Sequence, residues 1–338
     1  MDLHAHKVPG TKYVRHHEPA PERNLYGEIK VFCGSASQEL GHEIVNYLGL
    51  VPGRYERVKF SNENIFVRLH ESVRGQDVYL VQTMASPVSD NIMELLIMLD
   101  TFHRDSAGRI TAVIPYLSYA RSDKKDQPRV PITARLIADM IQVAGADRYI
   151  TIDLHSGQIQ GFFKIPGDVL TAFYLLSDYL ADRQIENAVV VTTDLGYAKR
   201  ARNYANRLQC PLAFVEKRRS SNVENPQLMA LIGDVAGKNV ILVDDEVNTG
   251  KSVANAVQIV KERGAQDIYL AFTHPILSAD GLERLASLPI KEIITTNTVP
   301  LPPEKRLPNM TILSVAPLLS EVIIRSHEGR SVGVLFDE

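Results

Sequence analysis

The chain has 338 residues, of which 45% are hydrophobic and 23% charged, and its formal net charge at pH 7 is -3. This is the composition of a globular protein with enough length for two domains of ordinary size. No apolar run approaches the roughly 18 residues that span a bilayer, and the charge gives no basic field for nucleic acid. We therefore expect neither a membrane nor a nucleic-acid partner.

The first 27 residues are rich in His, Pro and charged residues and lack the apolar segment of a secretory signal. We expect residues 1–27 to form a flexible extension. The two cysteines, Cys33 and Cys210, both lie in apolar stretches. Buried, reduced thiols are the simplest interpretation, and they favour a cytoplasmic location.

Farther along the chain, short apolar runs alternate with longer segments of helical period, which predicts an α/β fold around parallel sheets. One unit opens at Val73 with "VRGQDVYLVQ", continues through a helix and returns as "RITAVIPY". A second opens at Val235 with "VAGKNVILVD" and returns as "DIYLAFTH". The shared plan indicates an internal duplication, so we predict an N-terminal domain over residues 28–175 and a C-terminal domain over residues 176–338.

The second unit contains the loop "ILVDDEVNTGKSVANAV", whose "NTGKS" invites comparison with a nucleotide-binding P-loop. That motif requires a glycine at position 245, where this chain has Asp245. Asp244 and Asp245 directly follow a buried strand, so we expect them at the carboxyl edge of the sheet, where open α/β folds bind ligands. Carboxylates there accept hydrogen bonds from vicinal sugar hydroxyls, directly or through bound Mg²⁺.

The residues after this acidic pair open the next helix, whose free N–H groups attract a phosphate. Two carboxylates that bind sugar hydroxyls, followed by backbone amides that bind a phosphate, suit a ribose 5-phosphate unit. The alternative is that the two acids are turn residues and Ser252 is a helix N-cap. The predicted phosphate-side residues are Asn248, Thr249, Gly250, Lys251 and Ser252.

This loop resembles the phosphoribosyl-pyrophosphate (PRPP) loop of type I phosphoribosyltransferases. The segment "YARSDKKDQPRVPITARLIADMIQVAGADRYITIDLHSGQIQGFF", residues 119–163, resembles the central segment of ribose-phosphate pyrophosphokinases, the PRPP synthetases. "NIMELLIMLD", "EKRRS", "THPILSADGLERL", "TNTVPLP" and "LLSEVIIRSHEGRSVGVLF" resemble the same family. The similarity runs from about residue 29 to residue 338, in order and without large gaps.

The resemblance implies two tandem type I phosphoribosyltransferase-like domains, each a mainly parallel sheet flanked by helices, and we expect the last helix to pack back on the N-terminal domain. It also implies Mg²⁺-dependent transfer of the β,γ-diphosphoryl group of ATP to the anomeric hydroxyl of ribose 5-phosphate, giving PRPP and AMP for nucleotide biosynthesis. Members of the family are homo-oligomers built from dimers and are often hexamers. A similar assembly is expected here.

Individual residues carry the match. His155 in "DLH" corresponds to a histidine that positions the metal-bound nucleotide, and Asp194 in "TTDLG" to a second metal or substrate acid; these two are the expected metal residues. Arg121 corresponds to the arginine of "YAR" that contacts ATP. Lys217 and Arg219 in "EKRRS" correspond to catalytic cations that stabilise charge on the transferring group.

Several residues depart from the family pattern on the ATP side. The stretch that typically reads Phe-Ser-Asp-Gly-Glu is "FSNEN" here, which keeps Phe60 for adenine but places Asn62 and Asn64 at acidic positions. Asparagine oxygens still accept hydrogen bonds from adenine or ribose groups, so these residues stay in the expected ATP site. Ser122 stands where glutamine often follows "YAR".

Further departures concern the sugar-phosphate side. Tyr197 replaces a usual glycine, and Asn248 and Lys251 stand where an aspartate and a small residue are common. Because these changes fall on ligand-facing loops, two alternatives stay open. One is the same chemistry on ADP-ribose or another ribose phosphate, and the other is a non-catalytic regulatory paralogue of a PRPP synthetase.

Overall fold

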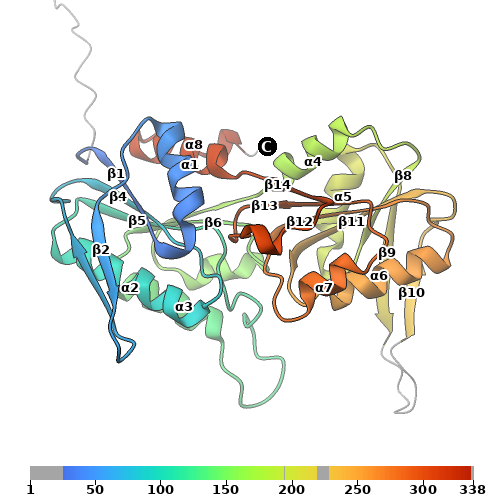
Figure 1. Ribbon diagram of the computed structural model, residues 1–338, viewed down its shortest axis with the longest axis horizontal. Helices are drawn as coiled ribbons and strands as arrows, with labels where there is room; N and C mark the ends of the chain where they lie inside the picture. The colour runs from blue at the N-terminus through green and yellow to red at the C-terminus, as the bar shows by residue number, and fades with distance from the viewer. Residues whose placement is uncertain (1–25, 194, 219–227, 336–338) are drawn as a thin grey trace, which may run out of the picture.

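The computed structural model describes residues 26–193, 195–218 and 228–335 (Figure 1). Most of the predicted N-terminal extension, residues 1–25, therefore lies outside the described residues. No helix within the described ranges is long and apolar enough to cross a membrane. Both cysteines are unpaired, and burial raises the pKa of the Cys33 thiol to about 11.

In the part of the chain that the structure describes, the N-terminal sheet has five parallel strands in the order β1-β4-β5-β6-β7. A separate antiparallel hairpin, β2-β3, packs on α2. The strands are β1 (Ile29–Cys33), β2 (Tyr55–Lys59), β3 (Ile65–Leu69), β4 (Asp77–Val81), β5 (Arg109–Ile114), β6 (Arg148–Ile152) and β7 (Gly167–Leu170). The helices are η1 (Ser35–Ser37), α1 (Gln38–Leu48), α2 (Val88–Arg104), α3 (Thr133–Val143) and η2 (Gly157–Phe162).

The C-terminal sheet has seven strands within the described ranges, in the order β10-β9-β8-β11-β12-β13-β14, and only β10 pairs antiparallel among them. The strands are β8 (Ala188–Thr192), β9 (Leu212–Arg218), β10 (Leu228–Ile232), β11 (Asn239–Val247), β12 (Ile268–Pro275), β13 (Glu292–Thr296) and β14 (Met310–Leu313). The helices are α4 (Phe173–Asp182), η3 (Leu195–Tyr197), α5 (Ala198–Arg207), α6 (Lys251–Glu262), α7 (Gly281–Ala286), η4 (Pro303–Lys305), α8 (Ala316–His327) and η5 (Gly333–Leu335).

Both predicted strand-helix-strand units form: β4-α2-β5 in the first sheet and β11-α6-β12 in the second, each with parallel strands. The α/β fold class is therefore confirmed. The predicted domain limit after residue 175 falls inside α4, which follows the last strand of the first sheet and precedes the first strand of the second. That limit stays a prediction.

Helices cover both faces of the two sheets (Figure 1). On one face, α1, α4, α5 and α8 lie over a single hydrophobic cluster that includes Val31 and Ile150 from the first sheet and Ile241 and Ile294 from the second. On the other face, α2 and α3 cover one cluster, whereas α6 and α7 cover another. The two sheets thus share a continuous core on one face only.

Helix α8 follows β14 of the second sheet but packs beside α1 at the first sheet (Figure 1). Its end is fixed by a buried charged group. Arg109 donates to Asp77 through Nε at 2.8 Å and Nη2 at 2.5 Å, and it also donates to the carbonyl of Ser326 at 3.1 Å. His327 Nδ1 lies 2.8 Å from Asp77 Oδ2. Polar contacts therefore join the C-terminal end of α8 to β4 and β5 of the N-terminal sheet.

We predict that Arg109→Leu destabilises the protein by about 3 kcal/mol, because it leaves the fully buried Asp77 carboxylate without its main counter-ion. Urea unfolding followed by circular dichroism measures this effect. The matched control is Arg104→Leu, which removes an arginine from an exposed pair with Asp100 and should leave the unfolding midpoint unchanged. Equal shifts in the two variants would contradict a structural role for the buried pair.

Candidate functional site

The candidate site lies where the carboxyl end of β6 meets those of β11 and β12. Thr273 Oγ1 on β12 donates to Asp153 Oδ2 at 2.8 Å, and Asp153 directly follows β6. His155 Nδ1 lies 2.9 Å from Asp245 Oδ2 on β11. The structure therefore brings together a histidine predicted for the nucleotide and an aspartate predicted for the sugar.

The two aspartates lie inside β11, whereas the sequence placed them just after the strand. This prediction of the strand end was wrong, because β11 continues to pair with β12 as far as Val247. Partners satisfy the two carboxylates in this position. Thr193 Oγ1 donates to Asp244 Oδ2 at 2.6 Å, the Asp245 amide donates to Asp244 Oδ1 at 2.9 Å, and the Glu246 amide donates to Asp245 Oδ1 at 2.9 Å.

Burial and neighbouring charges shift the pKa values of Asp244, Asp245 and His155 in different directions. Burial, followed by the charge of Asp245, raises the pKa of Asp244 above its usual range. Burial also acts to raise the pKa of Asp245, but the hydrogen bond with His155 leads the opposing effects, and the net shift is downward. The same hydrogen bond raises the pKa of His155. Asp245 and His155 thus favour each other's charged forms.

Glu246, the residue after the pair, was missed by the sequence analysis. Its side chain is only 4% exposed and pairs with Arg121, whose own side chain is 57% exposed. The contact brings Arg121, from the segment after β5, to the end of β11. The only sequence signal for Glu246 was that it is the third acid in "VDDEV". Its partner Arg121 lies too far away in the sequence for the pair to form a local pattern.

The predicted phosphate loop connects β11 to α6. Gly250 has a φ of 68°, in the left-handed region that favours glycine, and α6 begins at Lys251. Asp244 and Glu246 also border a cavity of about 60 Å³ beside this loop. The structure brings the predicted loop residues together around it with the predicted arginine: Asn248, Thr249, Gly250, Lys251, Ser252 and Arg121.

Helix α7 and the residues before it hold this loop from one side. Ser278 Oγ donates to Asn248 Oδ1, and Arg284 Nη1 donates to the carbonyl of Thr249. Gly281 approaches so closely that a Cβ there would lie 2.4 Å from the Asn248 carbonyl oxygen. These contacts fix the backbone of the loop before any ligand binds.

The residues predicted to bind adenine lie elsewhere. Phe60, Asn62 and Asn64 form the turn of the β2-β3 hairpin, where the Asn64 amide donates to Asn62 Oδ1 at 3.2 Å. The Phe60 side chain is 51% exposed. Figure 1 shows the hairpin at one end of the molecule, whereas β11 and α6 lie in the opposite half. A single chain does not bring these residues together with the phosphate loop.

Other predicted residues contribute differently or cannot be placed. Ser122 Oγ accepts a hydrogen bond from the Thr133 amide at 3.3 Å, at the start of α3, and does not line the small cavity. Asp194 and Arg219 lie outside the described residues, as does the side chain of Lys217.

Mg²⁺ fits the donors of this site. Among the described residues there is no cluster of three or more His, Cys, Asp or Glu side chains arranged for a metal ion. Mg²⁺ commonly uses only one or two protein carboxylates together with water and substrate phosphates. The carboxylate oxygens of Asp244 and Asp245 are donors of the required type. Of the two expected metal residues, His155 lies beside them, with its Nδ1 2.9 Å from Asp245 Oδ2.

Comparison with known proteins gives one consistent result. Residues 29–145 match the model of the N-terminal domain of ribose phosphate pyrophosphokinase, and residues 218–337 match the phosphoribosyl synthetase-associated domain. The ribose-phosphate pyrophosphokinase of Caldanaerobacter subterraneus subsp. tengcongensis is 47% identical over 310 residues, covering 91% of this chain and 98% of the relative. That of Clostridium acetobutylicum is 45% identical over 313 residues, covering 92% and 98%.

A solved structure agrees with the sequence matches. The crystal structure of phosphoribosylpyrophosphate synthetase from Mycobacterium smegmatis has a TM-score of 0.84 and 42% identity, covering 89% of this chain and 99% of that chain. The shared architecture is that of tandem phosphoribosyltransferase-like domains, each a mainly parallel sheet flanked by helices. The chain belongs to the ribose-phosphate pyrophosphokinase family.

We predict that Asp245→Asn lowers the pKa of His155 toward its ordinary value of about 6.5, because the variant removes the carboxylate that stabilises the imidazolium. A titration of the His155 ring protons by NMR in both proteins measures the shift. In the wild type the pair stabilises the fold fully below the unfolded-state pKa, and this contribution is lost as pH rises through the higher folded-state pKa. An unchanged His155 pKa in the variant would refute the interpretation that Asp245 stabilises the charged form of His155.

Proposed function

We propose that this chain catalyses Mg²⁺-dependent transfer of the β,γ-diphosphoryl group of ATP to the anomeric hydroxyl of ribose 5-phosphate, giving PRPP and AMP for nucleotide biosynthesis. The supporting observation is the cavity that joins the phosphate loop, the acidic strand β11 and Arg121 in a member of this family. The anomeric oxygen attacks the β-phosphorus of ATP. The bond from that phosphorus to the oxygen bridging it to the α-phosphate breaks, and AMP leaves.

On the acceptor side, we assign the 5-phosphate to the cavity at residues 248–252 and the ribose hydroxyls to Asp244 and Asp245. The N-terminus of α6 and Lys251 supply positive potential for the phosphate. The cavity, of about 60 Å³, is held on one side by Arg284 of α7. The similarity to ribose-phosphate pyrophosphokinases over nearly their whole length favours ribose 5-phosphate over ADP-ribose.

On the donor side, we assign Arg121 and His155 to the ATP phosphates and Lys217 and Arg219 to the charge on the transferring group. Arg121 has the planar guanidinium that binds phosphate oxygens in pairs, and it already borders the acceptor cavity. Mg²⁺, when bound with ATP, neutralises phosphate charge. His155 and Asp194 are the proposed protein contacts of the metal-bound nucleotide. Fixed cations and alignment then supply most of the catalysis.

We predict that the purified protein releases AMP from MgATP and forms PRPP with ribose 5-phosphate, with little turnover on ADP-ribose. Product masses identify the acceptor. His155→Ala should lower kcat by about 100-fold, and removal of Mg²⁺ with EDTA should abolish turnover. A protein that binds ATP but releases no AMP with either acceptor would instead support the regulatory paralogue.

We also propose that the protein works in the cytoplasm as a homo-oligomer, such as a hexamer, that is built from dimers. The unpaired thiols support that compartment. The oligomer is supported by the β2-β3 hairpin, whose turn contains Phe60, Asn62 and Asn64 and which lies in the opposite half of the molecule from β11 and α6 (Figure 1). If these hairpin residues contact ATP, they contact it at the site of a second copy.

A complementation experiment tests the shared site. Phe60→Ala and His155→Ala chains are co-expressed with different tags, and the mixed assembly is isolated through both tags. In a two-fold dimer one of the two composite sites is then intact, so we predict roughly half of the wild-type turnover per dimer, although each variant alone is nearly inactive. A mixed assembly as inactive as the single variants would place Phe60 and His155 at the same chain's site.

A further inference from the structure

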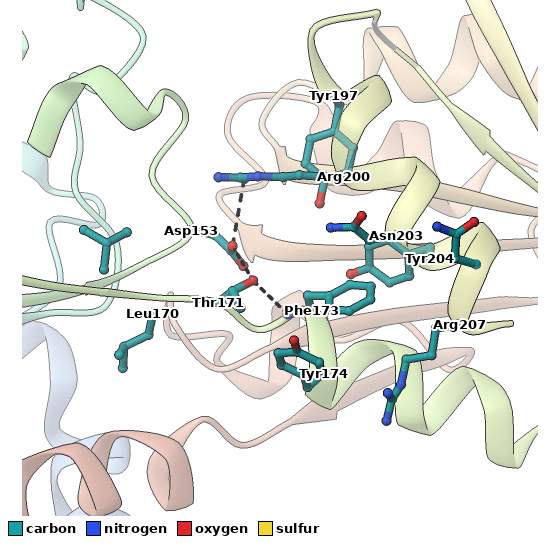
Figure 2. Close-up of a pocket in the computed structure, with 12 residues that line it drawn as sticks. Asp153, Leu170, Thr171, Phe173, Tyr174, Tyr197, Arg200, Asn203, Tyr204 and Arg207 are labelled. Carbon is teal, nitrogen blue, oxygen red and sulfur yellow. Dashed lines mark hydrogen bonds and ion pairs between the residues drawn. The ribbon is translucent and has the colours of Figure 1, made fainter. Parts of the chain in front are cut away.

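Arg200 connects α5 to the turn that carries His155. The residues Asp153, Leu154 and His155 follow β6 of the first sheet, whereas α5 belongs to the connection from β8 to β9 of the second sheet. Arg200 Nη1 lies 3.8 Å from Asp153 Oδ1 (Figure 2). Its Nη2 donates to the carbonyl of Leu154 at 3.0 Å. One guanidinium therefore holds the peptide that immediately precedes His155.

The turn needs such support because its backbone is unusual. Asp153 has a φ of 42°, in the left-handed region that side chains other than glycine adopt rarely. Its carboxylate is fixed by the Thr171 hydroxyl at 2.9 Å, the Ala172 amide at 3.0 Å and the Thr273 hydroxyl at 2.8 Å. These partners set the start of the turn. The next carbonyl along the turn, that of Leu154, accepts its hydrogen bond from the Arg200 side chain.

Two residues of the C-terminal half, Asp245 on β11 and Arg200 on α5, thus orient His155. Asp245 holds its ring through Nδ1, and Arg200 holds the peptide before it. We infer that Arg200 is a positioning residue for the diphosphoryl transfer, which sets the direction of the His155 side chain without contacting substrate. This inference rests on the proposed function and adds a residue that the sequence analysis did not single out.

The surroundings of Arg200 make the inference testable by chemical rescue. Arg200 lines a cavity of about 860 Å³ together with Phe173, Tyr197, Asn203 and Tyr204 (Figure 2). Its guanidinium carbon lies 5.6 Å from the centre of the Tyr197 ring. Truncation at position 200 would leave an accessible space in which free guanidinium can reach the Leu154 carbonyl and the Asp153 carboxylate.

The test compares Arg200→Ala with Arg207→Ala. Arg207 lies on the same helix and lines the same cavity, but it bonds Asp178 at the surface rather than the turn. Misplacement of a catalytic group by about 1 Å costs on the order of 100-fold, so kcat of Arg200→Ala should fall by about that factor. The KM for ribose 5-phosphate should change much less than kcat, since the phosphate cavity at residues 248–252 does not include Arg200 or His155. Arg207→Ala should behave as the wild type.

Millimolar guanidinium should then raise kcat of Arg200→Ala by about tenfold and leave kcat of the wild type and of Arg207→Ala unchanged. Arg200→Lys should retain part of the activity.

NMR provides a readout that needs no turnover. The His155 ring signals should shift in Arg200→Ala and return to their wild-type positions when guanidinium is added. If the wild type makes no PRPP, the proposed function fails, and this NMR comparison still decides the inference. Unmoved His155 signals, or lost activity with a lower melting temperature and no rescue, would overturn it.

Discussion

The site depends on a set of buried hydrogen bonds between the end of β6 and the end of β12. Thr273 donates to the Asp153 carboxylate, and the His274 ring lies 3.1 Å from the carbonyl of Ile152. All of these groups are buried, and a buried polar group without a partner costs about 1–3 kcal/mol. These hydrogen bonds hold the two sheets in a relative position in which His155 and Asp245 lie within hydrogen-bond distance.

The hydrophobic core reinforces this alignment unevenly. On one face a single cluster runs under α1, α4, α5 and α8 and joins both sheets. On the opposite face the clusters under α2 and α6 are separate, and a cavity of about 660 Å³ lies between them, lined by Tyr116 and Tyr119 from one side and by Asn248 and Leu277 from the other. Shared packing on one face thus keeps the strand ends together while the other face leaves room beside the phosphate loop.

Local patterns in the sequence predicted the elements but not their exact ends. Apolar periodicity was sufficient for β4-α2-β5 and β11-α6-β12, since a buried strand and an amphipathic helix are recognisable within a dozen residues. The end of β11 was misplaced because two adjacent carboxylates are typical of a loop. They are stable in a strand here because Thr193, 51 residues from Asp244, and His155, 90 residues from Asp245, supply hydrogen bonds. Such partners are visible only in the folded chain.

Adjacent residues of one motif can also have different roles, which family patterns do not separate. Arg121 reaches Glu246 and the phosphate loop, whereas the next residue, Ser122, receives hydrogen bonds at the start of α3. Similarly, the pattern assigns Phe60 to the nucleotide but does not say that its hairpin lies in the opposite half of the molecule from β11 and α6 (Figure 1).

The departure at Tyr197 shows how a structure changes the meaning of a substitution. A glycine at this position suggests a backbone that needs a left-handed conformation or a close approach. Tyr197 has a φ of -90° and a ψ of 0°, which any residue can adopt, so the backbone here does not require glycine. The added ring lines the large cavity beside Arg200, where there is space for it. The tyrosine therefore adds a ring beside the arginine that holds the His155 turn, and it does not border the cavity at the phosphate loop.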